Sequence, residues 1–369
     1  MSKFNALNTS YKEGKYPLFL GQTLGLADTV NVTYPQLEAM YQKQLSQIWN
    51  EFEVDLTQDR MDMNRLPFEV VRPMQQTISW QSLADAVAAR SISEVLLRHC
   101  TNPELEHWIN LWSFFETIHN RTYAHIIKQT FQNPVEMLED TYNNTQVLRR
   151  SDVIVKALDA AAELKDDTPD FIKRRVIIKA LVAIFALESI AFMASFAVTF
   201  GIAETGSFQG IGQLVTLICR DEMLHARVGL EILSILRKDP DWKLDFLIIN
   251  GEIQEILDAV YTQETEWAEH IFKDGSIPGQ SAERLKSYVD FISLPIYKVF
   301  GLESSFPGTI VDKLPLHYMT KYIDSSNTQV AAQELQITSY QIGIIKEDAD
   351  NFSLDTSSLD LVKDYTYTL

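Results

Sequence analysis

The sequence predicts an all-α fold, a bundle of long helices, on three observations. Apolar side chains recur at helical spacing along most of the 369 residues. No series of segments alternates between apolar and polar residues as β-strands would, and no glycine-rich loop suggests a phosphate site. The longest expected helices, 102–132 and 170–204, exceed the ordinary length of a globular helix, which is typical of helix bundles.

Turn and capping signals bound the expected helices. Asn102 followed by Pro103 supplies a cap and a proline at the first helical position, and Asn133-Pro134 ends that helix. Asp239-Pro240 and Asp274-Gly275 break the helical pattern further along the chain. The expected helices cover 34–49, 79–98, 102–132, 146–165, 170–204, 208–237, 246–272 and 281–299.

Composition indicates a globular chain and excludes several classes of function. Apolar residues make up 46% and charged residues 22%, and 50 acidic against 32 basic side chains give a net charge of −18. This acidity argues against general nucleic-acid binding, because phosphates would be repelled. Two cysteines are too few for a disulfide scaffold or a thiolate metal site and suit a reducing, cytoplasmic compartment. The N-terminus lacks the apolar core of a signal peptide.

The segment 180–203 is nearly all apolar and long enough to span a bilayer. Its one charge before Glu204 is Glu188, near its middle. A lone carboxylate at that depth of a membrane would cost ~2.5–3.5 kcal/mol or more. We therefore expect no membrane span but a helix buried on all sides in a helical protein, in which Glu188 needs a partner.

Two Glu-x-x-His motifs, at 116–119 and 222–225, carry the chemistry of the sequence. Residues three apart share a helix face, so each motif offers one carboxylate and one imidazole to the same point. Glu188 and Asp85 add isolated carboxylates on two further helices. This is the ligand set of a di-iron or di-manganese site in the four-helix core of a ferritin-like bundle. The candidate metal ligands are Asp85, Glu116, His119, Glu188, Glu222 and His225.

A third motif of the same form, Glu104 to His107, is excluded by its position. At ~100° per residue, His107 lies ~180° around the helix from Glu116. Glu104 is interpreted as an acid that complements the dipole of the first helical turn, and His107 as a surface or packing residue. The remaining histidines, His99, His125, His270 and His317, receive the same interpretation.

Tyr123 lies on the helix stripe of Glu116 and His119 and should point towards the metals. Phe192, Phe196 and Ile218 follow or precede candidate ligands at helical spacing on their own helices and could form an apolar pocket around it. Such a pocket would exclude water and reductants from a phenoxyl radical. Apolar residues at this spacing equally well form an ordinary core, and a lone buried tyrosine more often has a packing role.

Short stretches along the chain carry a family resemblance: 25–27, 44–49, 83–85, 103–106, Trp112, 116–123, 186–188, 220–225, 272–276, 330–334 and 339–340. On these stretches the sequence resembles the small, radical-generating subunit of class I ribonucleotide reductase, from about 17 to 340. The resemblance implies a ribonucleoside-diphosphate reductase subunit that uses O₂ to form a tyrosyl radical. It implies that Asp85, Glu116 and His119 hold one metal, that Glu188, Glu222 and His225 hold the other, and that Glu116 and Glu222 bridge.

The same resemblance implies a radical path. Tyr123 would carry the radical, and Asp221 would accept a hydrogen bond from His119 and fix its tautomer. Trp49 would pass electrons to the site through Asp221 and His119, and Tyr340 would relay the radical to the large subunit. Glu334, close to Tyr340 in the sequence, would assist proton transfer or docking. The implied cofactor is two iron ions, and two manganese ions also suit these ligands.

The expected organisation is an N-terminal arm at 1–30, a ferritin-like di-metal domain at 31–330, and a flexible tail at 331–369. The resemblance implies a homodimer that binds the large, nucleotide-binding subunit through this tail, with no nucleic-acid or membrane partner. Two alternatives stay open at this point. One is a stand-alone di-iron oxidase or oxygenase, and the other is a ferritin-like iron-binding protein.

Overall fold

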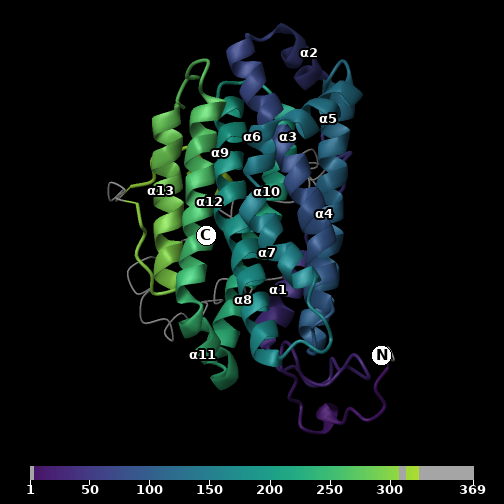
Figure 1. Ribbon diagram of the computed structural model, residues 1–369. Coiled ribbons are helices and arrows are strands. Elements are labelled where there is room, and N and C mark those ends of the chain that lie inside the picture. Colours follow the sequence, from purple (N-terminus) through teal and green to yellow (C-terminus); the bar gives the residue numbers. More distant parts are fainter. Residues whose placement is uncertain (1–3, 307–312, 324–369) are drawn as a thin grey trace.

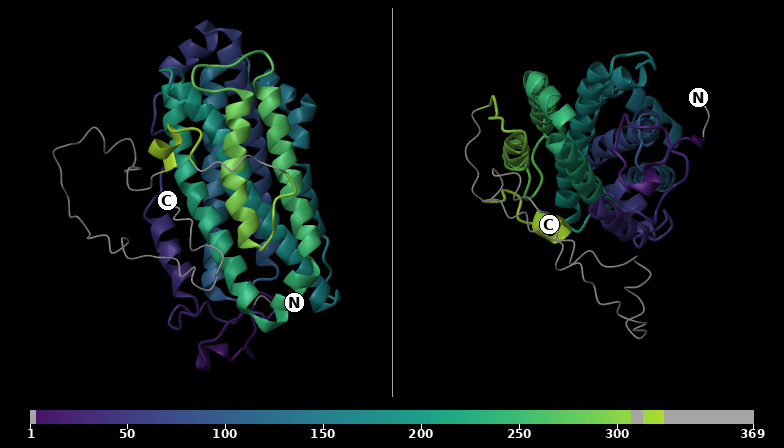
Figure 2. Two further views of the ribbon diagram at one scale, coloured as in Figure 1. Left: turned by 90° about the vertical axis from the view of Figure 1, so that its left-hand side faces the viewer. Right: turned by 90° about the horizontal axis from the view of Figure 1, so that it is seen from below.

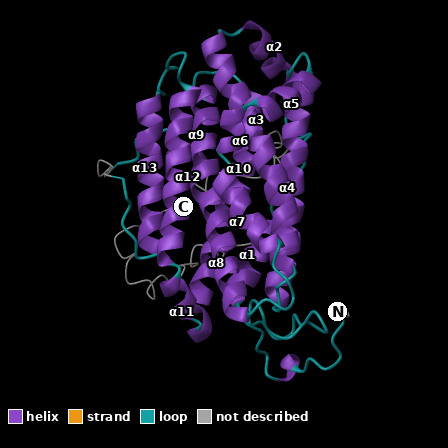
Figure 3. Ribbon diagram, in the orientation of Figure 1, coloured by secondary structure: helices purple, strands orange, loops and turns teal. Residues whose placement is uncertain are grey.

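The computed structural model describes residues 4–306 and 313–323 and confirms the all-α prediction. Every regular element in these ranges is helical, apart from two isolated bridges (Figure 3). The expected tail at 331–369, with Glu334 and Tyr340, lies outside the described residues. The long helices run alongside one another, and the segment before α1 lies at one end of the bundle (Figures 1 and 2).

Four segments of the bundle pack against one another: α3, α4, α10 and the long apolar segment made of α8 and α9. Helices α3 and α4 pack together along their length, α10 contacts α8, α9 and α4, and α12 pairs with α13. A π-helical turn (Leu187–Ala191), called here the π turn, joins α8 to α9. The helices are α1 (Pro35–Leu45), α2 (Thr57–Arg65), α3 (Phe68–Ser91), α4 (Pro103–Thr130), α5 (Pro134–Asn143), α6 (Thr145–Arg149), α7 (Asp152–Ala162), α8 (Asp170–Ala186), α9 (Phe192–Ala203), α10 (Gln209–Lys238), α11 (Pro240–Ile248), α12 (Asn250–Ile271), α13 (Ala282–Val299) and α14 (Met319–Ile323).

Several expected boundaries are wrong, for local reasons. Helix α3 begins at Phe68, so Pro73 lies inside it, although an interior proline removes one intrahelical hydrogen bond. The expected helix 146–165 is broken at Arg150, and α1 ends at Leu45, which leaves Trp49 in the following loop. The helices α2 and α5 were not expected, since both are short and α2 is strongly polar.

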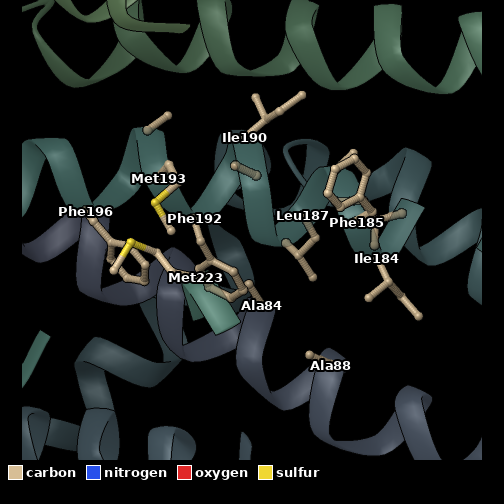
Figure 4. Close-up of a cluster of buried hydrophobic side chains, with 14 of the residues drawn as sticks. Ala84, Ala88, Ile184, Phe185, Leu187, Ile190, Phe192, Met193, Phe196 and Met223 are labelled. Atoms are coloured by element: carbon tan, nitrogen blue, oxygen red, sulfur yellow. The ribbon is translucent and has the colours of Figure 1, made fainter. Parts of the chain in front are cut away.

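The apolar segment is a core helix, as expected. Asp170–Ala203 is long and apolar enough to cross a membrane, but 83% of its most apolar stretch is buried inside the structure. Figure 4 shows Phe192 of this segment beside Ala84 of α3, and Ile190 on the opposite side of the segment. Because neighbouring helices cover it on all sides, the segment needs no lipid to bury its apolar surface.

Helix α10 depends on α2 for its N-terminal cap. Phe208 precedes it with a φ of 52° and offers no side-chain oxygen. Asp59 accepts hydrogen bonds from the Gly210 and Ile211 backbone N–H groups at 3.2 and 2.8 Å, and Asp62 accepts one from Phe208 at 2.8 Å. A Cβ at Gly210 would lie 2.4 Å from Asp59 Oδ2, so this close approach requires glycine. The helix that carries Glu222 is thus fixed at its start.

Candidate metal centre

The six candidate ligands converge in the middle of the bundle. Asp85 comes from α3, Glu188 from the π turn, and each Glu-x-x-His motif from one long helix, α4 or α10. All six side chains are fully buried. Their ligand atoms form two groups, each within 4.8 Å, that share Glu116 and Glu222: Asp85, Glu116, His119 and Glu222 in one, and Glu116, Glu188, Glu222 and His225 in the other.

Unpaired atoms inside this cluster fit a pair of cations. Both oxygens of Asp85 and both oxygens of Glu188 have no hydrogen-bond partner. His225 faces the cluster with Nδ1, which lies 2.6 Å from Glu222 Oε2 and 3.1 Å from Glu116 Oε1. His119 Nδ1 lies 2.9 Å from Glu222 Oε1 without hydrogen-bond geometry. Buried carboxylates without partners are strongly disfavoured in a protein interior. Two divalent cations would satisfy these atoms, and four carboxylates with two imidazoles suit iron or manganese.

Burial and mutual repulsion disturb the carboxyl groups of the cluster. Burial raises the pKa of Asp85 and of Glu188 well above the usual range, and the charges of Glu222 and Glu116 raise each further. Without a metal, the site therefore favours the protonated form of both acids. A bound cation would reverse this preference.

The pKa values of the two histidines are raised, although burial alone would lower them. Burial lowers the pKa of His225, but the carboxylates of Glu222 and Glu116 outweigh it and raise the value to about 9. Burial also lowers the pKa of His119. The charge of Glu222 and the hydrogen bond with Asp221 outweigh burial and raise this pKa well above its usual range. The pKa of Glu222 shifts in the other direction. Burial would raise it, but the charges of His119 and His225 hold it well below the usual range. The metal-free centre thus keeps its charge balanced with protons.

Metal binding is expected to release protons, because the raised pKa values of Asp85, Glu188, His119 and His225 favour protonated forms that must lose their protons to become ligands. Metal affinity should therefore fall as the pH falls from about 9 to 6. The proton count follows from titration calorimetry of Mn²⁺ binding in buffers of different ionisation enthalpy. A binding heat that does not depend on the buffer would contradict the assignment, and Glu188→Gln should release fewer protons than the unmodified chain.

A hydrogen-bonded chain leads from the centre to Trp49. Trp49 Nε1 donates to Asp221 Oδ2 at 2.7 Å, and the same oxygen lies 3.2 Å from His119 Nε2. The Trp49 and His119 rings are stacked, with centroids 6.1 Å apart. Gln44 and Arg220 donate to Asp221 Oδ1 and hold the carboxylate in place. Asp221 therefore lies between Trp49 and His119 and contacts both side chains.

Tyr123 is completely buried, and its hydroxyl has no hydrogen-bond partner. Tyr123 follows His119 by four residues on α4, so it lies on the same helix face. Burial raises its pKa well above the usual range, and the carboxylates of Asp85, Glu222 and Glu116 raise the pKa further. Phe192, Phe196 and Ile218 are also fully buried. The first two stack at 5.6 Å on the apolar helix, beside Met223 (Figure 4).

The sequence does not show the further contacts of several residues. Glu104 lies in the first turn of α4, as expected, but it is 2% exposed and also accepts hydrogen bonds from the backbone N–H groups of Thr33 and Tyr34. Trp112, whose Nε1 donates to Glu116 Oε1 at 2.8 Å, was not singled out for this role. His107 is half-buried against Tyr41, away from the centre, as expected.

Comparison with known proteins decides the family. A family model described as "Ribonucleotide reductase, small chain" matches residues 27–315. The chain belongs to the ribonucleotide reductase small-chain family. It is 31% identical to "Ribonucleoside-diphosphate reductase 1 subunit beta" of Salmonella typhimurium, over 94% of this chain and 96% of that one. The corresponding subunit of bacteriophage T4 is 29% identical over 91% and 94%.

Solved structures of the small-chain family share the fold. A "Ribonucleotide reductase R2 subunit" from Clostridium botulinum superposes with a TM-score of 0.74 at 18% identity and covers 87% of this chain and 98% of its own. The "dimanganese(II)-NrdF" of Streptococcus sanguinis gives 0.65 at 16% identity, over 79% and 98%. The expected ferritin-like bundle and the expected enzyme, ribonucleoside-diphosphate reductase, are confirmed, and the buried cluster together with the family supports a dinuclear metal site.

Proposed function

We propose that this chain is the subunit that generates and exports the radical of a ribonucleoside-diphosphate reductase, with Tyr123 as the radical site. The observation that carries the proposal is a fully buried phenol on the same helix as one Glu-x-x-His motif of a fully buried cluster, in which the four oxygens of Asp85 and Glu188 lack hydrogen-bond partners. The names of the relatives supply the reaction, which is reduction of ribonucleoside diphosphates to deoxyribonucleotides. The small subunit works with a large, nucleotide-binding subunit.

The proposed ligands divide between two metal positions. Asp85 and His119 would serve one position and Glu188 and His225 the other, and Glu116 and Glu222 would bridge because both ligand groups contain them. Two iron or manganese ions, reacting with O₂, supply the oxidising power that a phenol requires. The chain itself contributes a dry site: every ligand side chain is fully buried, which excludes water and stray reductants.

To become the radical, Tyr123 would give one electron to the O₂-oxidised metal pair and its phenolic proton to an oxygen atom of the same centre. Its hydroxyl forms no hydrogen bond, so no protein partner has to be displaced. The buried rings of Phe192 and Phe196, and Ile218, would form the apolar wall that lets the radical persist. No solvent reaches this side chain to quench it.

Trp49 would connect the centre with the surface of the protein. Asp221 Oδ2 accepts from the indole N–H, and from His119 Nε2–H in the tautomer that leaves Nδ1 free for a metal. Electrons would enter along Trp49, Asp221 and His119, and the radical would leave by the same route towards Tyr340. We assign docking of the large subunit to the segment 331–369 and expect a cytoplasmic homodimer.

The two alternative functions fit the chain less well. A stand-alone oxidase or oxygenase needs an open substrate pocket beside its metals, whereas all six candidate ligands here are fully buried. Neither that enzyme nor an iron-storage protein has a use for the hydrogen-bonded chain from His119 to Trp49. The family match and coverage of 96% of a reductase subunit favour the first proposal.

Deleting residues 341–369 is expected to abolish ribonucleoside-diphosphate reduction by iron-loaded protein mixed with its large subunit, while the tyrosyl radical signal stays unchanged. The reason is that docking and radical formation would use separate parts of the chain. Product formation and electron paramagnetic resonance, measured on the same samples, test this. Undiminished reduction by the shortened chain would contradict the docking role, and no reduction by the full chain would contradict the proposed function.

A further inference from the structure

Arg150 is a buried cation outside the metal cluster. It follows α6, in the middle of what sequence periodicity presents as one helix, and its side chain is 1% exposed. Its Nε and Nη2 donate to the two oxygens of Glu264 on α12 at 2.7 and 2.5 Å, a bidentate pair. Glu264 is equally buried. An ion pair at this depth is weak evidence for a stabilising role, because its desolvation cost is large.

The same guanidinium contacts both segments that carry the unshared carboxylates of the metal cluster. Nη2 also donates to the Ala191 carbonyl at 2.9 Å, at the end of the π turn and three residues after Glu188. The guanidinium carbon lies 3.6 Å from the Trp80 ring centre and 4.7 Å from that of Trp267. Trp80 precedes Asp85 by five residues on α3 and packs edge-on against Phe192 at 5.4 Å.

We propose that Arg150, held by Glu264, is a positioning residue for Glu188: its hydrogen bond to Ala191 fixes the π turn and so determines the affinity of the metal position that Glu188 serves. This inference rests on the proposed dinuclear centre. The contact with Ala191 is direct, whereas Asp85 lies more than one helical turn from Trp80. The Glu188 position is therefore the one that should respond.

Lysine cannot replace arginine in this role. One ammonium group cannot form the fork with Glu264, reach the Ala191 carbonyl and stack between two indoles at the same time. Loss of an outer partner of a metal ligand typically lowers metal affinity 10–100-fold. We expect Arg150→Lys to weaken one of the two metal positions by about 10-fold or more and to leave the other unchanged.

Titration of metal-free protein with Mn²⁺, followed by electron paramagnetic resonance, gives both dissociation constants and shows whether the ions are coupled. Arg150→Lys should replace the coupled-pair signal by a mononuclear one at stoichiometric Mn²⁺. In a Glu188→Ala background, Arg150→Lys should have no further effect on the remaining ion, because the position it acts on is already lost. Hydrogen exchange at the amides of 190–195 should rise in Arg150→Lys.

Two further variants separate positioning from folding. In the double variant Arg150→Met/Glu264→Met no buried charge is left unpaired, so the fold should persist while the selective loss of one ion remains. Arg72→Lys is the matched control: Arg72 also ties α3 to the end of α12, through the Ile271 carbonyl at 3.2 Å, but it lies thirteen residues from Asp85. This variant should bind both ions normally.

The outcomes are distinct. Equal weakening of both positions, or no weakening in either Arg150→Lys or the double variant, overturns the positioning role. Further weakening by Arg150→Lys in the Glu188→Ala background overturns it as well. If the unmodified chain binds no pair of ions, the proposed metal centre fails; if it binds two and the variants do as well, only the role of Arg150 fails.

Discussion

Replacing Tyr123 by phenylalanine is expected to remove the radical signal of the iron-loaded, oxygen-treated protein and to lower nucleotide reduction with the large subunit by more than about 1,000-fold, or ~4 kcal/mol in the barrier. The change removes one oxygen atom and keeps the ring. The lost hydroxyl has no hydrogen-bond partner, so the fold should not be weakened. Metal content should stay the same, because the substitution keeps all four carboxylates and both imidazoles of the two ligand groups.

Tyr297→Phe is the control for this experiment. Tyr297 is also buried, on α13, but its hydroxyl donates to Asp258 at 2.6 Å, outside the metal cluster. Its removal should leave the radical signal intact. Electron paramagnetic resonance and product formation decide the matter: a tyrosyl signal that survives in Tyr123→Phe, or one that disappears in Tyr297→Phe, means that the radical lies elsewhere.

Replacing Glu188 by alanine or by glutamine should lower the iron content from about two ions to about one per chain. Glu188 offers two unpaired carboxylate oxygens to the group that also contains His225. Glutamine keeps the volume and removes the charge, so a matching loss in both variants excludes a simple cavity effect. Metal analysis after reconstitution and desalting provides the count.

The matched control for Glu188 is Glu252→Gln, since Glu252 is an exposed acid on α12 that pairs with Lys179. It should retain two ions. Two tightly bound ions in both Glu188 variants would remove this residue from the proposed ligand set. A loss of both ions would mean that the two positions are not independent, and that Glu188 acts on the whole centre.

The sequence predicts the centre better than it predicts the connections. Each Glu-x-x-His motif lies within one helical turn, so its geometry follows from the helix alone. Glu188 stands out because one charge in an apolar helix requires a partner. The helices α2 and α5 escape the same reasoning, because their stability depends on contacts with distant segments such as α10 and α3.

The residues that hold the candidate ligands in place could not be predicted from the sequence either. Arg150 meets Glu264 across more than a hundred positions, and Gln44 meets Asp221 across an even longer stretch. No periodicity connects such residues, so only the folded chain shows the pairs. The break at Arg150 within the expected helix 146–165 is the one local sign of its special environment, and sequence alone attaches no meaning to it.

Anomalous diffraction at the iron edge, from crystals of the iron-loaded protein, tests the central claim most directly. The account predicts two peaks about 3.5–4 Å apart, enclosed by Asp85, Glu116, His119, Glu188, Glu222 and His225, with the Tyr123 phenol beside them. A single peak, or peaks bound by other residues, would contradict it.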